Sequence, residues 1–428
     1  MWNFRYLYLV FFLVYFDVCY SQIEINKYRN DFKQAEIIFD RIHEICKLDN
    51  GNLCGINLYC PLLLVDRETR FIFSNHSLSF SEDSSLNGLY VGVLPSNYLI
   101  SNSTIYIDST LYAIFSFEKD MGIDVLVEIG IHEMFHYWQE KNNWYHASYY
   151  NDHVETKWGK VYLTLEMKAI QKAFSTEDNQ KKKNAIVEAL YFRKQRHVLF
   201  SDKIPDEINF EIHEGLPDYV KMMLCLKNDS LIRLQLVHEI KELLNENKFL
   251  RTFGYVSGSS YAYLLNNPML LKEVIINGKD IVEILKTSMN ITTIPDSLPS
   301  SVLEKYDYEA IVHKEDSIEK DKIAFVERIK KQLRESKKLI IPLEGVNFGF
   351  NPYDVYSIDT IGTYYPYISV SGNFGQIYSN MGGIISNDII LFWDDNTQNG
   401  KYKISLNNGW SIKKKEGVYF LELESKYE

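Results

Sequence analysis

The chain has 428 residues, of which 46% are hydrophobic and 24% are charged, a balance typical of folded globular proteins. Its 46 basic and 57 acidic residues give a formal net charge of −11. This acidic balance argues against nucleic acid as a partner, because phosphate backbones are bound by clustered basic side chains. The basic stretches KKKN and RKQRH, which begin at Lys181 and Arg193, lie in a helix-like region and are expected to be solvated.

Residues 1–21 have the pattern of a secretory signal peptide. Arg5 precedes an apolar run, Tyr6–Phe16, which is too short to span a bilayer but fits the hydrophobic core of a signal. Cleavage after Ser21 would leave small residues, Cys19 and Ser21, at positions −3 and −1. We therefore expect an exported mature chain that begins at Gln22 and is secreted, periplasmic or held at the cell surface. No later stretch is apolar enough to span a membrane.

Four cysteines remain once the signal is removed. Export would allow them to oxidise, and four cysteines permit three pairings, between which the sequence does not choose. Their spacing contains no C-x-x-C zinc pattern. Disulfide formation and buried free thiols both stay open as interpretations. The residues concerned are Cys46, Cys54, Cys60 and Cys225.

The mature chain begins with an amphipathic helical pattern, which is followed by a region with the composition of β-strands. Apolar residues recur near a 3.6-residue period over Glu24–Cys46, which predicts a helix. From Leu58 to Phe117, short β-branched and aromatic runs alternate with Ser, Asn, Asp and Gly, which predicts a mostly antiparallel sheet. Long helical segments and shorter pieces up to Thr287 follow. The long segments are Gly122–Asn142, Val154–Phe174, Asn184–Phe200, Asp206–Leu226 and Leu231–Asn247.

The C-terminal part has a different composition. A loop at Asn290–Ser301 precedes a charged helix at Ser317–Lys337. After Lys338, runs such as DIILFW and VYFLELE are separated by Gly and Asn turns and predict strands. The fold class expected is α+β, with a larger domain at residues 22–337 and a small all-β module at residues 338–428.

The segment Gly130–Trp138, GIHEMFHYW, contains two histidines four positions apart. On a helix His132 and His136 lie on one face, so both imidazoles can reach one metal ion about 2 Å from each. Glu133 can hold a water on that metal and accept its proton. The flanking residues are uncharged, so the helix is expected to be buried, where an unpaired imidazole costs free energy. We predict a metal site; the alternative is two core histidines.

A second segment, Asn209–Leu224, supplies a third ligand. Glu214 and Asp218 are four positions apart, so on a helix they face the same way. Glu214 completes a His2Glu set with an open fourth position, the arrangement of a catalytic zinc. Asp218 can accept the other N–H of a zinc-bound histidine and fix its tautomer. One Zn²⁺ per chain is expected.

The pattern H-E-x-x-H followed, after a long gap, by E-x-x-x-D resembles that of the gluzincin metallopeptidases, the superfamily of thermolysin and aminopeptidase N. HEGLPDY is also similar to the EG-x-A-x-Y segment of many members. The resemblance covers roughly Leu58–Leu285 and implies a zincin-like catalytic domain, an antiparallel sheet beside a mostly helical subdomain. The roles it implies are zinc ligation by His132, His136 and Glu214, general base catalysis by Glu133, and orientation of a ligand by Asp218.

Phe253–Asn266 is similar to the Y-x-x-G stretch that follows the third ligand in aminopeptidase-N-like enzymes. On that match Tyr255 donates to the oxyanion, with Tyr261 as second choice; a packed aromatic residue in a helix cap is the alternative. Two features depart from the family pattern. Pro217 removes an N–H just after the third ligand, and no G-x-M-x-N segment precedes the zinc motif, so an aminopeptidase is not implied.

The remaining polar residues receive simpler interpretations. His213 is expected either to orient the second zinc histidine or to replace Glu214 as a ligand. Other histidines and paired acids on charged helices are expected to face solvent. These are His153, His197, His238, Glu207 and Glu211.

The function expected is an exported zinc peptidase acting on a peptide or protein substrate. Two alternatives remain. One is a non-catalytic surface protein whose β module binds glycan or protein through aromatics such as Tyr364–Tyr367 and Trp393. The other is a zinc hydrolase of a non-peptide amide or ester. The peptidase requires Glu133, whereas the binding protein does not.

Overall fold

The computed structural model describes residues 29–83, 88–117, 121–144, 149–351, 354–395 and 400–424. The expected signal segment lies outside these ranges. Helices and strands occur together in two compact units, residues 1–312 and 313–428, which confirms the α+β class. The second unit begins inside helix α13 (Tyr308–Glu335), whereas the sequence led us to place the boundary at residue 338.

The first unit opens with helix α2 (Arg29–Asp49) and a six-stranded sheet of order β3-β4-β2-β1-β6-β5. Most neighbours are antiparallel, as expected, but β1 and β6, which lie inside the sheet, are parallel. β5 forms one edge of the sheet. The strands are β1 (Leu62–Asp66), β2 (Phe71–Ser74), β3 (Ser81–Asp83), β4 (Tyr90–Val93), β5 (Ser103–Ile107) and β6 (Thr110–Phe117).

Both faces of the central strand β1 are buried, which explains its unbroken apolar sequence. Leu62 and Leu64 join the main core, which they share with α2, whereas Leu63 and Val65 join a small cluster on the opposite face. Successive side chains of a strand point to opposite faces, so one LLLV run serves both cores.

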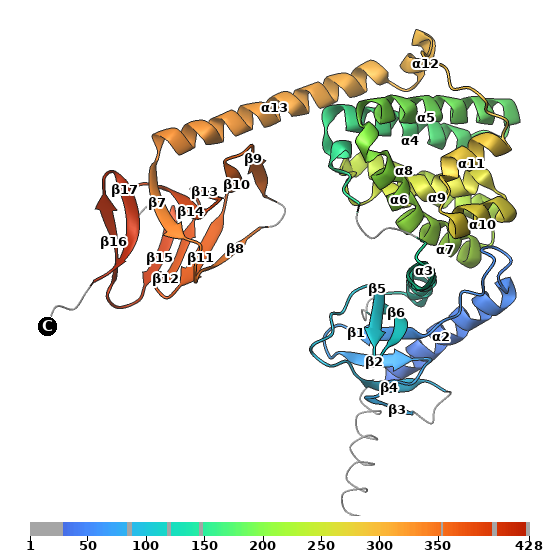
Figure 1. Ribbon diagram of the computed structural model, residues 1–428, viewed down its shortest axis with the longest axis horizontal. Coiled ribbons are helices and arrows are strands. Elements are labelled where there is room, and N and C mark those ends of the chain that lie inside the picture. Colours follow the sequence, from blue (N-terminus) through green and yellow to red (C-terminus); the bar gives the residue numbers. More distant parts are fainter. Residues whose placement is uncertain are drawn as a thin grey trace, which may run out of the picture. The chain divides into compact units, whose positions relative to one another are not determined.

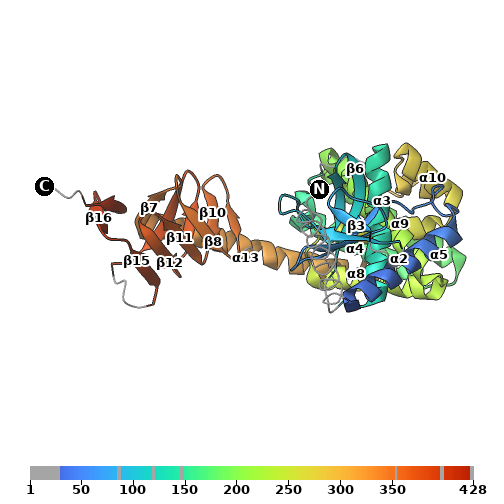
Figure 2. The ribbon, with the colours of Figure 1, turned by 90° about the horizontal axis from the view of Figure 1, so that it is seen from below.

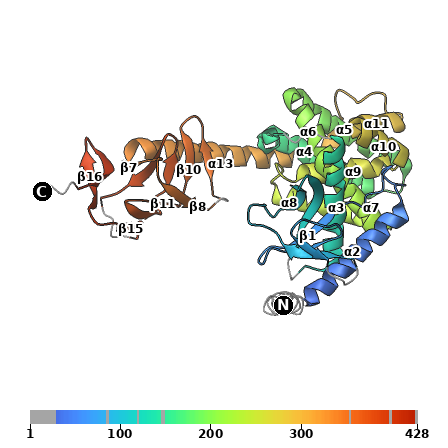
Figure 3. The same cartoon turned by 60° about the horizontal axis from the view of Figure 1, so that its bottom comes forward.

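Helix α3 (Ile123–Asn142) lies between the sheet and the helical remainder of the unit (Figures 1 and 3). It packs closely on α2 and β6 at Gly130, where a Cβ would lie 2.6 Å from the side chain of Ile42. Asn143 ends the helix in the left-handed conformation, with φ 52°. The helix that carries both histidines is therefore enclosed, as its apolar sequence predicted.

The helical remainder covers the other side of α3, with α7 packed directly against it (Figure 1). α5 begins five residues before the expected start because the Asp178 side chain accepts hydrogen bonds from Gln180 N and Lys181 N. The helices are α4 (Lys157–Phe174), α5 (Asn179–Leu199), α6 (Ile204–Phe210), α7 (Leu216–Leu226), α8 (Asp229–Glu246), α9 (Phe253–Leu265), α10 (Pro268–Asn277), α11 (Ile281–Ser288) and α12 (Ser300–Lys305). Short 3₁₀ turns lie at Asp152–Glu155 and Ser201–Lys203, and a π turn, η3, at Glu211–Gly215.

The second unit contains two sheets, seen in orange and red in Figure 2, of orders β16-β17-β7-β14-β13-β10-β9 and β15-β12-β11-β8. One apolar cluster combines residues of both sheets, and another joins the larger sheet to α13 through Ile329. The strands are β7 (Lys337–Pro342), β8 (Asn347–Phe350), β9 (Tyr356–Ile358), β10 (Gly362–Tyr365), β11 (Ile368–Gly372), β12 (Gly375–Ser379), β13 (Gly383–Ile385), β14 (Asp388–Trp393), β15 (Tyr402–Leu406), β16 (Trp410–Lys415) and β17 (Val418–Leu423).

The aromatic residues that suggested a binding surface in this unit belong mainly to its cores. Tyr364, Tyr365 and Trp393 are at most 8% exposed, and only Tyr367 of this group is half exposed. Their number is therefore explained by packing between the layers.

The four cysteines of the described chain are free thiols in the first unit. Burial raises the pKa of Cys46 and of Cys225 to about 12 and that of Cys54 and Cys60 well above the usual range. Free thiols, one of the two interpretations left open, are what this structure contains: Cys46, Cys54 and Cys60 are buried, and Cys225 is partly buried. Within its described residues, no helix is both long and apolar enough to cross a bilayer.

Candidate metal centre

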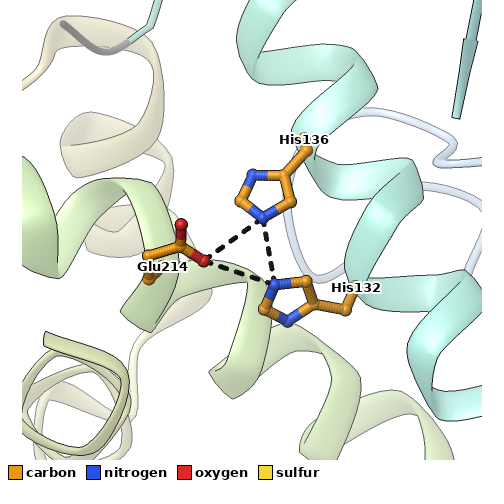
Figure 4. Close-up of side chains that lie close together, drawn as sticks. All are labelled: His132, His136 and Glu214. Carbon is orange, nitrogen blue, oxygen red and sulfur yellow. Dashed lines mark hydrogen bonds and ion pairs between the residues drawn. The ribbon is translucent and has the colours of Figure 1, made fainter. Parts of the chain in front are cut away.

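Helix α3 and the π turn η3 bring His132, His136 and Glu214 together (Figure 4). The Nε2 atoms of His132 and His136 are 3.0 Å apart. Oε2 of Glu214 lies 3.6 Å from Nε2 of His132 and 3.4 Å from Nε2 of His136. The three side chains are only 9–11% exposed. The 77 residues between His136 and Glu214 include helices α4, α5 and α6, as expected for such a long gap.

Asp218 determines which nitrogen of His132 faces the centre. Nδ1 of His132 lies 3.0 Å from Oδ1 of Asp218, and a carboxylate can only accept, so Nδ1 carries the hydrogen. Lys221 Nζ donates to the same oxygen at 2.6 Å. Burial alone would raise the pKa of Asp218, but hydrogen bonds from His132 and the charge of Lys221 hold it below the usual value. Nε2 of His132 therefore presents its lone pair to the centre.

Gln139 determines which nitrogen of His136 faces the centre. Its Nε2 donates to the carbonyl oxygen of Ile212 at 2.8 Å, which leaves its Oε1 facing Nδ1 of His136 at 2.7 Å. An amide oxygen can only accept, so Nδ1 of His136 carries the hydrogen and Nε2 its lone pair. In a π turn the donor to the Ile212 carbonyl would be residue 217, and Pro217 has no N–H. Gln139 thus supplies a donor that Pro217 cannot.

These contacts leave three acceptor atoms facing one another. Two imidazole lone pairs and one carboxylate oxygen converge, and only a positive centre between them removes their mutual repulsion. Zinc ligands about 2.0–2.1 Å from the ion at tetrahedral angles are separated by roughly 3.3–3.4 Å. The observed separations of 3.0, 3.4 and 3.6 Å bracket that value. The group can hold a metal ion.

The electrostatics of the ligands agree with a cation site. Burial alone would lower the pKa of His132, but hydrogen bonds to Asp218 and Glu214 outweigh it and raise the pKa to about 9. Burial alone would raise the pKa of Glu214, but contacts with the surrounding histidines hold it far below its usual value. The raised pKa of His132 means that, without a metal, this imidazole tends to be protonated at neutral pH, so metal binding would be coupled to loss of that proton.

Glu133 lies beside this centre without being part of the ligand group. It is 5% exposed, and its Oε2 has no hydrogen-bond partner among the described residues. Burial raises the pKa of its carboxyl group. A buried carboxylate oxygen without a partner is costly unless a bound group supplies a donor, which a metal-held water would do.

A cavity of about 380 Å³ opens onto the centre. One wall is the sheet edge, with Asn102, Ser103 and Thr104, and Thr104 is tied to α3 by a hydrogen bond to Glu140. Further lining residues are Ile129, His132, Glu133, His136, His213, Glu214, Asp218, Lys221 and Tyr255. The three members of the group, Glu133 and a strand edge therefore share one cavity.

Of the two tyrosines considered from the sequence, only Tyr255 lines this cavity. Its ring stacks on His132 with centroids 6.0 Å apart, and burial together with the charge of Glu214 raises its pKa. The phenol therefore stays protonated and able to donate. Tyr261 is fully buried elsewhere, where its hydroxyl donates to Glu166 at 2.6 Å.

His213 and Tyr149 surround the other oxygen of Glu214. Nδ1 of His213 is 3.2 Å and the hydroxyl of Tyr149 is 3.4 Å from Oε1, and the ring of His213 lies 4.7 Å from that of His136. Gln139, rather than His213, bonds to Nδ1 of His136. Gln139 has a local signal in the sequence, since it is three positions after His136 on the same helix. Tyr149 has none, because a long segment separates it from Glu214.

Several residues expected to face solvent are buried, and these predictions were wrong. Arg193 and Arg196, from the supposedly solvated RKQRH stretch, form ion pairs with Glu166, Glu207 and Glu211. His153 is 3% exposed and bonds to Glu207 at 2.5 Å. His197 is partly buried beside Glu207, while His238 is exposed as expected. These charged side chains were expected to face solvent because the carboxylates that pair with them lie on other elements, some distance away in the sequence.

Replacing Gln139 by leucine is expected to weaken zinc binding roughly 10–100-fold, the usual effect of losing a group that orients a metal ligand. The change frees the tautomer of His136 and removes the donor to the Ile212 carbonyl. Zinc affinity is measured by competition with a chromophoric chelator. The control is Gln235→Leu, because the Gln235 side chain donates to Glu239 on its own helix and lies outside the cavity of the centre; an equal loss in both variants would contradict the assignment.

No protein-family model matches this sequence, and searches of curated proteins and of solved structures likewise find nothing similar. The function is therefore inferred from the side chains of the centre itself.

Proposed function

We propose that this chain is a zinc-dependent peptidase of gluzincin type that acts after export. The observation that carries the proposal is the meeting of three ligand atoms at zinc-like separations beside Glu133, whose Oε2 has no hydrogen-bond partner among the described residues. Two histidines and one carboxylate, with an open side toward a cavity, are the donor set of a catalytic rather than a structural zinc.

The chemistry divides between the metal and the side chains. A bound zinc ion supplies Lewis acidity, which polarises a carbonyl and lowers the pKa of water. Glu133 accepts the proton of the attacking water and then delivers it to the leaving amine. Its raised pKa suits both steps, because the proton must be held and then released. Tyr255 donates a hydrogen bond to the developing oxyanion.

The strand edge beside the centre favours a peptide substrate. β5 is the last strand of its sheet, and Ser103 and Thr104 at its start line the cavity. An extended peptide can add to such an edge through main-chain hydrogen bonds, which presents successive carbonyl groups along the cavity. Residues of several kinds are accepted in this way, since the backbone carries the recognition.

Two other functions give different expectations. A non-catalytic binding protein is disfavoured by the burial of Tyr364, Tyr365 and Trp393, its best sequence support. A zinc hydrolase of non-peptide amides or esters uses the same groups and differs only in substrate.

The test is the zinc content of the mature chain together with a screen for peptide cleavage. We expect about one zinc per chain by elemental mass spectrometry and cleavage products in a diverse peptide library by mass spectrometry. A chain that takes up no zinc even after reconstitution would make the histidines core residues and remove the proposal. A zinc-loaded chain that cleaves small amides or esters and no peptide would move the assignment to the second alternative.

A further inference from the structure

A buried network of charges includes Glu211, a residue of the π turn that carries Glu214. It links three helices to the turn, and none of its members lines the cavity of the metal centre. The charged members are at most 3% exposed, which is rare for ionised side chains unless they are paired. They are Glu166 on α4, Arg193 and Arg196 on α5, Glu207 on α6 and Glu211 on η3.

Glu211 connects this network to the turn itself. Arg193 forms a bidentate ion pair with Glu211, in which Nη1 donates to Oε1 at 2.7 Å and Nη2 donates to Oε2 at 2.6 Å. Ser257 on α9 adds a third hydrogen bond to Oε1 at 2.7 Å. Paired contacts of this kind fix direction as well as distance, because both planar groups must align.

The π geometry separates the two carboxylates of the turn. In an α-helix, residues three apart differ by about 60° in direction, which would put Glu211 and Glu214 on nearly the same face. A π helix has roughly 4.4 residues per turn, so the difference widens to about 115°. One carboxylate can then face Arg193 while the other faces the two histidines.

The neighbouring helix α9 restricts rotation of the turn. A Cβ at Gly258 would lie 2.5 Å from the carbonyl oxygen of Glu211, and a Cβ at Gly215 would lie 2.5 Å from Cα of Gly258. The two backbones are therefore in direct contact, which only glycine permits. Any rotation of the turn that moved Glu214 would have to break the contact with Arg193 or push into α9.

We propose that Glu211 is a positioning residue, which through Arg193 and Ser257 fixes the π turn so that Glu214 meets His132 and His136 at metal-binding distance. This inference rests on the metal centre of the proposed function. It assigns a purpose to a buried ion pair, whose contribution to stability alone is usually small because desolvation offsets the attraction.

The experiment compares Glu211→Gln with Glu207→Gln in the mature chain. Both substitutions preserve size and remove one buried carboxylate that pairs with one arginine, Arg193 or Arg196 respectively. Both are expected to lower the melting temperature. Only Glu211→Gln is expected to weaken zinc binding, by roughly 10–100-fold, as for loss of a group that orients a ligand. Zinc affinity is read by chelator competition, independently of any activity.

Equal losses of zinc affinity in the two variants would show that the effect is general destabilisation, and the proposal would be overturned. Unchanged zinc affinity in Glu211→Gln would also overturn it. Ser257→Ala removes a single uncharged contact to Glu211 and serves if Glu211→Gln does not fold. A measurable loss of affinity in Ser257→Ala supports the role, and parent-like affinity overturns it. Parent chain without zinc would instead refute the metal centre itself, so the two failures are distinguishable.

Discussion

Replacing Glu133 by glutamine is expected to lower kcat by roughly 10²–10⁴-fold while zinc stays bound, the range typical of a lost general base. The carboxylate is not in the ligand group, so the metal content should remain that of the parent. Glutamine has the same shape but cannot accept a proton at neutral pH. The measurement is kcat on a peptide found in the library screen, with zinc per chain determined on the same sample.

The control for this prediction is Glu128→Gln, which removes a carboxylate from the same helix at a position outside the cavity. Its kcat is expected to stay within about threefold of the parent, as for most partly exposed substitutions. If Glu133→Gln retained the activity of the parent with zinc bound, the water would be activated by another group and the proposed mechanism would fall.

Replacing Glu214 by alanine is expected to have the largest effect on metal binding. The variant keeps the imidazoles of His132 and His136 but loses the carboxylate, which is the charged member of the group. The charge of a bound Zn²⁺ would then no longer be partly neutralised by a ligand. Since losing an orienting group costs about 10–100-fold in affinity, loss of the ligand itself should exceed 100-fold. Zinc per chain after exhaustive dialysis checks the prediction.

Glu133→Gln provides the comparison, because it removes an equally buried carboxylate from the same cavity without removing a ligand. Near-parent zinc in that variant and little zinc in Glu214→Ala separate ligation from general disturbance of the site. A Glu214→Ala chain that retains one tightly bound zinc would show that the ion is held by other residues.

The parts of the site that the sequence could predict are those set by spacing within one helix. His132 and His136 face one way because they are four apart on α3, and Glu214 and Asp218 are related similarly across η3 and α7. The long-range step, that these two segments meet, came only from resemblance to a family. The structure places Asp218 against His132, and that contact depends on the packing of α7 on α3.

The parts that escaped prediction depend on partners distant in sequence. Arg193 and Arg196 sit among lysines and look solvated, and only the approach of α4, α6 and the π turn encloses them. Pro217 indicates from the sequence that helical hydrogen bonding is interrupted near the turn. The sequence does not predict that the interruption takes the form of a π turn. The fold class was predictable because periodicity is local, whereas the parallel pairing of β1 and β6 was not.

The buried thiols give the first unit a chemical reporter of its own integrity. Sulfur attacks alkylating reagents as the thiolate, and with the pKa of Cys46 and Cys225 raised to about 12, almost none is ionised at neutral pH. Unfolding restores the ordinary pKa and removes the burial of Cys46, Cys54 and Cys60 and the partial burial of Cys225. The rate at which Cys46, Cys54, Cys60 and Cys225 become alkylated therefore follows the opening of the core that also contains residues of α3.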